Sequence, residues 1–561
     1  INLNFKDQNL EEVFLTKNGT IRKNFPHKEK KITIEISKII LKNFINSKKE
    51  LTIKRTCSFL KIARMIFEEY NELKTRKNAL DFSDVLIKTK ELLTQSFAKE
   101  FALSKICSTI KCIMIDEAQD LSQLQWKLIS LFCEEIFSPE QKEKTIFIVG
   151  DVKQSIYRFQ NANHRLLSEF YNYAKTTLNS VGKKFQTVYL NKCYRSLPKI
   201  LDIVDKIFMK NSYFAFNQSN EEYQKHVPQR TSNEGKVQII ETMDTTEIVN
   251  FIKKLIESDI TRPADILILS RSRNELYENI ISKLNEHKIK IAPPDRIKLS
   301  ENLLVMDLLA LADVCINPQD YEYSLACVLK SPYIFKNPLS DKELFNICRN
   351  RSVSIFENFK NLGEEKTNTI YDCIAKHKEN NLVEFFYHII LKIIVKSNKN
   401  DNYILSCFMN EVINFSNKIS NNIKEFIDYF RQNEIEISNP NVDNSAIRIS
   451  TIHGAKGLES PIVILLDFDL KANKSKAFFM WSYEEKIFAN NKQAFPIFFI
   501  KPNVSDSFDE ANYFIEKEYK EEESELFRLL YVALTRAKDQ LYVAGRNNGK
   551  NIIDLIATAM T

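Results

Sequence analysis

Short apolar runs that end in acidic or glycine residues constrain the fold of this chain more than any other feature. Cys112–Ile115 runs directly into Asp116, and Thr145–Val149 runs into Gly150 and Asp151. Short continuous apolar runs of this kind are typical of strands buried in a parallel sheet. Similar runs occur later in the chain, at 237–241, 266–269, 447–451, 462–466 and 541–544. The sequence therefore predicts an α/β fold built on parallel sheets.

The spacing of these runs predicts how the chain is organised. At 30–75, apolar residues recur at helical spacing between Lys and Glu residues, which predicts helices. The later runs form two clusters with a helical stretch between them, which predicts a second α/β lobe interrupted by a helical insertion. The predicted domains are a helical remnant of an insertion at 1–75, a partial first lobe at 76–185, a second lobe formed by 186–275 and 441–561, and the helical insertion at 276–440.

Composition narrows the class of protein without deciding its function. None of the apolar runs reaches the ~18–20 residues needed to cross a bilayer, and the first residues lack the pattern of a signal peptide. The 10 cysteines include no Cys-x-x-Cys pair, so we expect reduced thiols rather than disulfides or a zinc site. These features predict a cytoplasmic protein with no membrane partner. A formal net charge of +7 permits nucleic-acid binding but could equally serve solubility.

Two adjacent carboxylates, Asp116 and Glu117, follow the first apolar run. Ligands of open α/β sheets bind at the carboxyl ends of the strands. One carboxylate at that edge could hold Mg²⁺ while its neighbour polarises an attacking water, as in nucleoside triphosphatases. An acidic loop without a ligand is the other interpretation of these two residues alone.

The second run leads into a segment with a glutamine and two aromatic residues. Gln154 is a neutral hydrogen-bonding group that could sense a terminal phosphate or orient a water molecule. Tyr157 and Phe159 flank the basic Arg158, an arrangement that suits stacking on unpaired bases. Core packing of the two rings is the alternative for this segment.

Two arginines, Arg195 and Arg536, each follow a partly apolar stretch of the chain. Arg195 follows Leu190–Tyr194, and Arg536 follows Leu529–Thr535. A guanidinium fork can neutralise charge on a transferring phosphoryl group when it reaches across a cleft. Either arginine alone could instead form a surface salt bridge.

A glycine-containing turn at 449–459 connects two of the predicted strands. Thr451 and His453 could contact a DNA phosphate, and Glu459 could accept a hydrogen bond from a ribose hydroxyl. A histidine in such a loop could also be purely structural.

In this order, the segments resemble the motifs of superfamily-one helicases of the UvrD, Rep and RecB kind. The resemblance rests on 116–120 as the Walker B box, 150–159 as the glutamine-and-aromatic motif, 194–196 as the first arginine motif, 451–459 as the threonine, histidine, lysine, glycine, leucine and glutamate motif, and 531–537 as the final arginine motif. It implies an α/β fold of two RecA-like parallel-sheet lobes, the first incomplete, with helical insertion domains.

Further segments are similar to AddA, the helicase–nuclease subunit that processes double-strand DNA breaks. They are 14–19, 80–84, 295–299, 305–309 and 329–332. The resemblance implies an ATP-dependent 3′–5′ DNA helicase of double-strand break repair. Such a helicase uses ATP and Mg²⁺, acts on DNA with a single-stranded tail or a double-strand end, and works with an AddB-like subunit.

The resemblance also implies a role for each motif residue. Asp116 and Glu117 would serve Mg²⁺ binding and water activation. Gln154 and Arg195 would contact the γ-phosphate, Arg536 the transition-state charge, and Glu459 the sugar. Tyr157 and Phe159 would stack on single-stranded bases, and Thr451 and His453 would contact the DNA backbone. The nucleotide-binding residues implied in this way are Gln154, Arg195, Lys456, Gly457, Glu459 and Arg536.

The sequence departs from the family pattern in four places. No G-x-x-x-x-G-K-[ST] phosphate loop occurs, so we expect the chain to begin after it. No metal-nuclease domain follows residue 546, so nuclease activity is expected to be absent. Asn161 stands where a glycine is typical, and Cys193 stands where an asparagine is typical, which predicts altered local geometry.

These departures leave two functions open. The first is a fragment of an AddA-like or RecB-like helicase that hydrolyses ATP weakly or not at all by itself. We expect apolar surface to be exposed where the missing piece of the first lobe would pack. The second is a non-catalytic DNA-binding remnant, or half of a split motor that a separate N-terminal half completes. A scaffold with decayed sites is disfavoured because the motif residues are still present.

Overall fold

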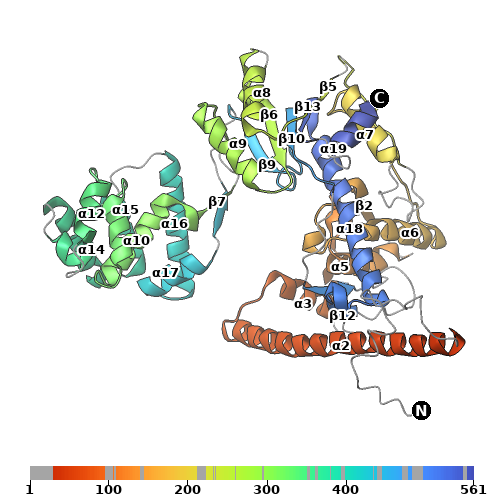
Figure 1. Cartoon of the computed structure of the whole chain (residues 1–561), viewed down its shortest axis with the longest axis horizontal. Helices are drawn as coiled ribbons and strands as arrows, with labels where there is room; N and C mark the ends of the chain where they lie inside the picture. Colours follow the sequence, from red (N-terminus) through yellow and green to blue (C-terminus); the bar gives the residue numbers. More distant parts are fainter. Residues whose placement is uncertain are drawn as a thin grey trace, which may run out of the picture. The chain divides into compact units, whose positions relative to one another are not determined.

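The chain divides into two units that are linked by two crossings of the backbone, near residues 288 and 450. The structure is a computed structural model, and one unit comprises Ile1–Lys288 with Ser450–Thr561 while the other comprises Ile289–Ile449 (Figure 1). The residues described are 30–94, 105–106, 109–138, 144–210, 223–231, 233, 235–258, 261–292, 296–349, 354–360, 364–379, 381–392, 399–433, 435–438, 445–470, 478–482, 497–546 and 552–560. Across these ranges, every helix is too short or too polar to cross a membrane.

The first part of the larger unit contains a two-stranded parallel sheet, and the described helices α5 and α6 pack against one of its faces. β1 (Cys112–Ile115) pairs in parallel with β2 (Thr145–Ile148), so that Met114 lies opposite Phe147. The isoleucines of both strands pack against a core that contains Trp126, whose ring lies 5.1 Å from the ring of Phe170. The elements of this part are α2 (Lys30–Arg76), α3 (Phe82–Thr94), β1, η1 (Ala118–Asp120), α5 (Gln123–Phe137), β2, η2 (Val152–Gln154), η3 (Arg158–Gln160) and α6 (Arg165–Ser180).

The interpretation of these two strands as buried holds for one face of the sheet only, and the other face shows the exposed apolar surface that was expected in the first lobe. Burial alternates along each strand, and the side chains of Met114 and Phe147 are 74% and 57% exposed. The physical reason is that α5 and α6 contribute a core on one face only. Because nearly every residue of these strands is apolar, the sequence does not show which face of the sheet packs against helices and which face is exposed.

A five-stranded sheet forms the second part of the larger unit, with the strand order β5-β13-β10-β6-β9. The pairs β5–β13, β13–β10 and β10–β6 are parallel, which confirms the predicted sheet type. Helices α8 and α9 lie on one side of this sheet, and α7, α18 and α19 lie on the other (Figure 1). The elements are β3 (Lys192–Cys193), α7 (Pro198–Lys210), β4 (Val227–Pro228), β5 (Lys236–Ile240), α8 (Thr245–Glu257), η5 (Pro263–Asp265), β6 (Ile266–Ser270), α9 (Glu275–Glu286), β9 (Arg448–Thr451), β10 (Ser460–Leu466), η7 (Val504–Asp506), α18 (Asp509–Leu534), β13 (Ala537–Ala544) and α19 (Ile552–Met560).

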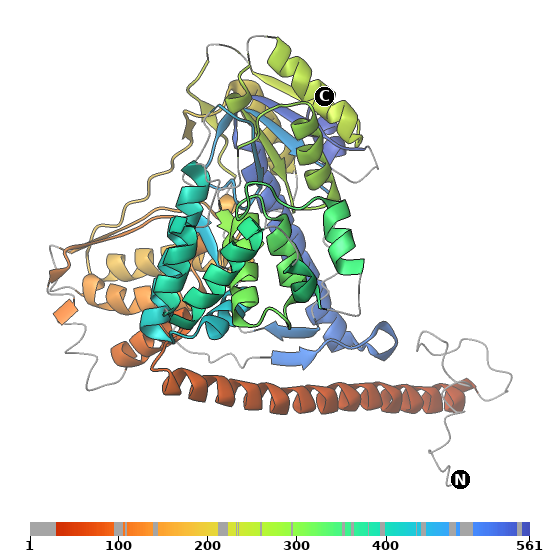
Figure 2. The same ribbon diagram turned by 90° about the vertical axis from the view of Figure 1, so that its left-hand side faces the viewer.

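Helix α2 confirms the predicted helical character of 30–75 as one element of 47 residues (Figure 2). It lies beside an antiparallel ribbon formed by β11 (Phe479–Ser482) and β12 (Ile497–Ile500). The Thr56 hydroxyl accepts a hydrogen bond from the Ile500 N–H at 3.1 Å, and the Phe59 ring stacks on Phe498 at 5.8 Å. These contacts attach segments that are far apart in the sequence.

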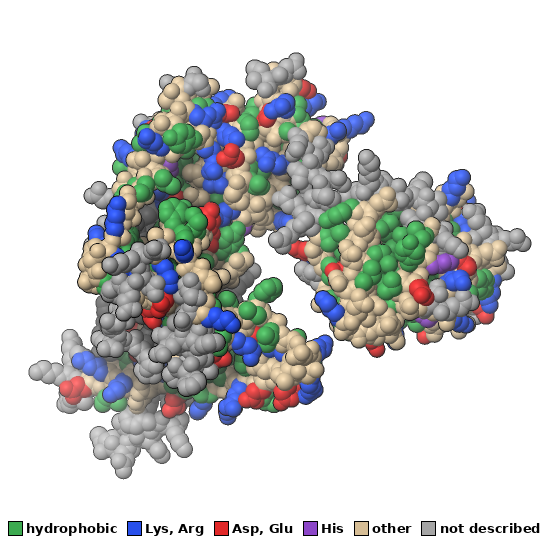
Figure 3. All heavy atoms as spheres, turned by 180° about the vertical axis from the view of Figure 1, so that it is seen from behind, with side chains coloured by type: hydrophobic (Ala, Val, Ile, Leu, Met, Phe, Trp, Pro, Cys, Tyr) green, Lys and Arg blue, Asp and Glu red, His purple; other side chains and the backbone are tan. Residues whose placement is uncertain are grey.

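The smaller unit is helical around an aromatic core. Ring pairs such as Phe386–Phe408 and Phe408–Phe426 meet edge to face at 5.1 and 5.9 Å. Within α10, the buried carboxylate of Asp313 pairs with Arg431 at 2.6 Å. Figure 3 shows hydrophobic side chains on one face of this unit. Its elements are β7 (Arg296–Lys298), η6 (Leu299–Glu301), α10 (Leu303–Ile316), α11 (Glu322–Lys330), α12 (Asp341–Arg349), α13 (Ile355–Phe359), α14 (Glu364–Glu379), α15 (Leu382–Lys392), α16 (Lys399–Lys418), α17 (Ile423–Gln432) and β8 (Glu436–Ser438).

Candidate functional site

The predicted carboxylate pair lies where β1 and β2 end. Hydrogen bonds continue past the strands, since the Val149 N–H donates to Ile115 at 2.8 Å and the Ala118 N–H donates to Val149 at 2.9 Å. Asp116 and Glu117 are both exposed at this edge. Glu117 has a positive φ of 49°, in the left-handed region that side-chain-bearing residues seldom adopt. Such a conformation is typical of functional sites that the surrounding structure holds in place.

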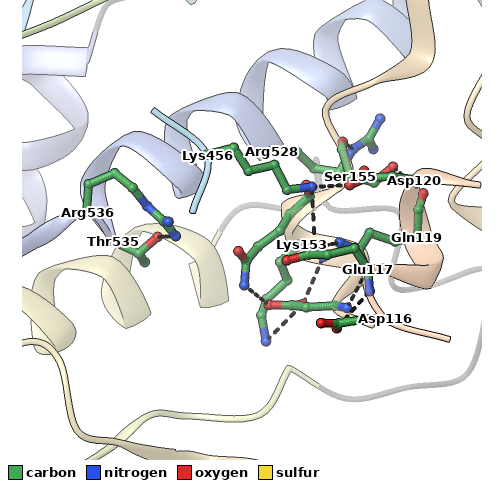
Figure 4. Close-up of polar contacts among 12 residues, drawn as sticks. Asp116, Glu117, Gln119, Asp120, Lys153, Ser155, Lys456, Arg528, Thr535 and Arg536 are labelled. Atoms are coloured by element: carbon green, nitrogen blue, oxygen red, sulfur yellow. Dashed lines mark hydrogen bonds and ion pairs between the residues drawn. The ribbon is translucent and has the colours of Figure 1, made fainter. Parts of the chain in front are cut away.

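The buried Gln119 holds this edge together (Figure 4). Its amide nitrogen donates to a Glu117 carboxylate oxygen, and its amide oxygen accepts the Asp151 N–H at 2.9 Å. Its backbone carbonyl accepts the Ser155 hydroxyl at 3.0 Å. A Cβ at Gly150 would lie 2.8 Å from the Gln119 amide oxygen and 2.8 Å from Leu167 Cδ2, so a larger residue there would displace the ends of these side chains. Sequence reasoning missed Gln119, although it lies within the acidic motif.

Gln154 lies at the end of η2 and is held by Asp151. Its side-chain amide nitrogen donates to Asp151 at 3.0 Å, and Asp151 also caps η2 by accepting the Lys153 N–H at 3.0 Å. The carboxylate of Asp151 therefore fixes the amide that the sequence predicted as a phosphate sensor.

Lys456 reaches the same edge from the loop at 451–459. Its ammonium donates to an Asp120 carboxylate oxygen and, at 3.0 Å, to the Gln154 carbonyl, and it lies 3.5 Å from a Glu117 oxygen. The side chain is only 8% exposed, and the ammonium lies 5.0 Å from the centre of the Tyr157 ring. Burial raises the pKa of Asp120, and the Lys456 charge opposes that rise. Lys456 thus contacts carboxylates, and the nucleotide contact predicted for it stays a prediction.

Arg195 and Glu459 form an ion pair on the second part of the unit. The Arg195 Nε donates to Glu459 Oε2 at 2.5 Å, and the Lys538 ammonium lies 2.7 Å from Glu459 Oε1. Donation from Lys538 and then from Arg195 lowers the pKa of Glu459. Arg230 supports the arrangement by donating to the Arg195 carbonyl at 2.6 Å. Lys538 and Arg230 were not predicted, although Lys538 directly follows the final arginine motif.

Arg536 is buried, with 2% of its surface exposed. Its Nε donates to the Val532 carbonyl at 3.0 Å and its Nη1 to the Leu458 carbonyl at 3.2 Å. Burial, with the nearby positive charge of Arg195, lowers the pKa of Arg536 to about 10. Both predicted arginines contact Thr535. A guanidinium nitrogen of Arg195 donates to the Thr535 carbonyl, and a guanidinium nitrogen of Arg536 donates to the Thr535 hydroxyl, each at 3.4 Å. The structure therefore brings the two guanidinium groups together around one residue.

The predicted DNA-contacting residues form an aromatic cluster. The Tyr157 and Phe159 rings lie 5.8 Å apart, and the Phe159 ring meets His453 edge-on at 5.5 Å. Phe159 is 67% exposed, which leaves its ring available for stacking. Burial lowers the pKa of His453, which favours the neutral ring. Thr451 lies beside this cluster in sequence, and its hydroxyl accepts the Gly454 N–H at 3.3 Å.

The structure shows the local backbone conformation or pairing of three positions in or beside the motifs. Gly457 has a φ of 83° with no atom near a Cβ position, so its backbone conformation explains the glycine. Asn161 has a φ of 64° and so adopts the left-handed conformation that asparagine tolerates. Cys193 pairs with Pro228 in the short β3–β4 sheet. The segment 14–19 and Asp295 lie outside the described residues.

The described residues contain no group of three or more His, Cys, Asp or Glu side chains arranged to hold a metal. Asp116 nevertheless fits Mg²⁺, because this ion is usually bound through one or two protein carboxylates together with phosphate oxygens and water. The exposed Asp116 carboxylate, at the carboxyl end of β1, is such a ligand.

Comparison with known proteins identifies related families and relatives. Residues 2–175 match the UvrD/REP helicase N-terminal domain, and residues 188–548 match the UvrD-like helicase C-terminal domain. The chain is 24% identical to an ATP-dependent helicase/nuclease subunit of Streptococcus sanguinis, over 86% of the chain and 44% of that protein. It is 24% identical to the protein of the same name from Enterococcus faecalis, over 86% of the chain and 43% of that protein. It is 26% identical to the protein of the same name from Lactobacillus delbrueckii subsp. bulgaricus, over 85% of the chain and 42% of that protein. The chain therefore spans less than half the length of these relatives.

Proposed function

Since this chain belongs to the UvrD-like helicase family, we propose that it provides part of an ATP-dependent 3′–5′ DNA helicase of the AddA or RecB kind, acting in double-strand break repair. One observation carries the proposal. The loop at 451–459 contacts three predicted centres, because Lys456 reaches the carboxylates, His453 meets the aromatic cluster, and Glu459 pairs with Arg195. A single loop in contact with all three is what a motor needs to link nucleotide and DNA.

The polar groups suit nucleoside triphosphate hydrolysis. Asp116 would hold Mg²⁺, which would neutralise charge on the phosphates, and Glu117 would orient the attacking water. Gln154 would hydrogen-bond to the terminal phosphate. Arg195 would exchange its bond with Glu459 for a phosphate oxygen, and Arg536 would stabilise the charge of the transition state.

The exposed Phe159 and the half-buried Tyr157 support single-stranded DNA as the partner. Tyr157 and Phe159 would stack on the bases of a single-stranded tail, which every base permits because each has a π face. Thr451 and His453 would contact the backbone as neutral hydrogen-bonding groups. The relatives are named as subunits of a helicase/nuclease, which supports a second protein component, and we propose that it is AddB-like.

None of the 561 residues forms a G-x-x-x-x-G-K-[ST] loop. The backbone N–H groups and the lysine that cradle the β- and γ-phosphates would therefore come from polypeptide outside these residues. We propose that the 561 residues alone hydrolyse ATP weakly or not at all.

A second candidate function is a half-motor completed by another chain, or a DNA-binding remnant. The uncovered face of β1–β2 favours the half-motor. Parallel sheets are normally covered on both faces, and a two-stranded sheet is marginal by itself. Met114 and Phe147, exposed side by side, suit packing against an additional helix or strand of a complementing segment.

The test compares ATP hydrolysis by the chain alone and with a supplied segment, which precedes the matched region in the Enterococcus faecalis relative. Single-stranded DNA is present throughout, and Glu117→Gln is the control. We expect hydrolysis to appear only with the segment and to disappear in the control. If the chain binds DNA but hydrolyses no ATP either alone or with the segment, the function that remains is that of a DNA-binding remnant. Failure to bind single-stranded DNA would refute both functions.

A further inference from the structure

Helix α18 presents a row of carboxylates to the aromatic segment. Glu518, Glu521 and Glu525 are spaced three and four residues apart, so they lie on one face of the helix. An Arg158 guanidinium nitrogen donates to Glu518 at 2.6 Å, and the Arg158 N–H donates to Glu525 at 3.2 Å. Arg165, the first residue of α6, forms an ion pair with Glu521. Arg158 and Arg165 are thus both bound to one face of α18.

The position of Arg165 does not serve its own helix. A cation at the first turn of a helix opposes the helix dipole, which favours negative charge there. The side chain instead extends to Glu521, and both groups are one-third exposed or less. The placement of Arg165 is therefore explained by α18.

Arg528 anchors the same face from within the core (Figure 4). It is 2% exposed, and it donates to the Ser155 carbonyl at 2.8 Å and to the Ser524 hydroxyl at 2.7 Å. The Ser155 hydroxyl in turn donates to the carbonyl of Gln119, whose amide holds Glu117. A continuous set of hydrogen bonds therefore extends from α18 to the carboxylate edge.

Helix α18 also leads directly to the arginine side of the site. It ends at Leu534, and Thr535 and Arg536 follow it. Arg158 lies between Tyr157 and Phe159. A displacement of the aromatic segment by a stacked base would be transmitted along a rigid helix to the residue that contacts both predicted arginines, Thr535.

We propose that Arg158–Glu518 and Arg165–Glu521 are positioning pairs that couple single-stranded DNA binding at the aromatic cluster to nucleotide binding at Arg195 and Arg536. The inference rests on the proposed function. The four side chains of these pairs are between 21% and 33% exposed. The role that we assign to the pairs is geometric, because they join the aromatic segment and the start of α6 to one face of α18. They fix which part of α18 moves with the aromatic segment.

The test measures the coupling itself. With the supplied segment present, the dissociation constant of a fluorescent, non-hydrolysable ATP analogue, which carries a γ-phosphate, is determined with and without saturating oligo-dT, and the ratio of the two values is the coupling factor. We expect a factor of about five or more in the unmodified chain. Arg165→Glu and Glu521→Arg should each reduce it to about one, and the double variant, which restores an opposite-charge pair, should recover it.

Lys520→Glu is the matched control. Lys520 lies on the same helix, is 69% exposed and pairs with Glu516. Its reversal should leave the coupling factor unchanged. Retained coupling in both single variants, or failure of the double variant to recover it while circular dichroism matches the unmodified chain, would overturn the inference. A chain that binds oligo-dT but no nucleotide would also overturn it, while leaving the DNA-binding part of the proposed function intact. A chain that binds neither ligand would refute both.

Discussion

Replacing Arg528 by methionine tests whether the buried guanidinium stabilises the larger unit. Methionine fills a similar volume but removes the hydrogen bonds to the Ser155 carbonyl and the Ser524 hydroxyl. Both serines are buried, at 4% and 8% exposure. A buried polar group left without its partner costs about 1–3 kcal/mol. We expect the two losses to lower the free energy of unfolding by about 2–4 kcal/mol, since methionine also avoids the cost of burying a charge.

The same variant should change the pH dependence of stability. Burial raises the pKa of Glu525, and the Arg528 charge opposes that rise. Without Arg528, the pKa of Glu525 in the folded state rises further above the unfolded value. Between these two values the folded state binds more protons than the unfolded state, so stability falls as pH rises. The destabilisation should therefore decrease when the pH is lowered from about 7.5 to about 5.5.

The assay is urea unfolding followed by the fluorescence of Trp126, a core residue of the larger unit. The chain has 2 tryptophans, so a Trp481→Phe background leaves Trp126 as the reporter. Lys520→Met, on the exposed face of α18, is the matched control and should change stability by less than about 0.5 kcal/mol. A loss below about 1 kcal/mol in Arg528→Met, or an increase of that loss at lower pH, would refute the reasoning.

Three further predictions concern the site. Phe159→Ala should weaken single-stranded DNA binding by about 1–3 kcal/mol in a fluorescence-anisotropy titration while leaving the unfolding midpoint unchanged, because the ring is 67% exposed; unaltered DNA affinity would contradict this. Gly150→Ala should destabilise the unit by about 1–3 kcal/mol in urea unfolding, because its Cβ would lie 2.8 Å from the Gln119 amide oxygen; equal stability would show that the amide moves freely. Lys538 lowers the pKa of Glu459 below its ordinary value of 4.5, so the stability from this pair is present above that pH and lost as pH falls through the lower, folded-state pKa. Glu459→Gln should therefore make the free energy of unfolding depend less on pH in the acid range. An unchanged dependence on pH in that range would argue against the pairing.

The parallel sheets and the motif positions could be predicted because their signals are local. The apolar run before Asp116 predicts a strand, and a carboxylate after a strand lies at the edge of the sheet where ligands bind. The structure confirms the parallel pairing of β1 and β2 and the strands that form the five-stranded sheet. The family matches confirm the helicase resemblance. The domain boundaries and the role of each site residue remain predictions.

The remaining features depend on contacts between distant residues. Arg528 resembles any basic residue on a helix until its hydrogen bond to Ser155, 373 positions away, is known. Lys456 contacts Asp120 across 336 positions, so its sequence neighbours gave no indication of its partners. The exposure of Met114 was also hidden, because an apolar residue in a strand does not reveal whether a helix covers its face.

If the proposed function holds, the ion pairs of Glu459 would also affect how a polyphosphate approaches the site. Arg195 and Lys538 share this one carboxylate, so the two cations present much less net charge to the solution than two unpaired cations would. Electrostatic steering depends on that net field and is weakened by salt. Capture of the nucleotide would then be limited by the exchange of Arg195 from carboxylate to phosphate at close range. Its association rate should vary little with ionic strength, whereas a site of unpaired cations would show a steep decrease.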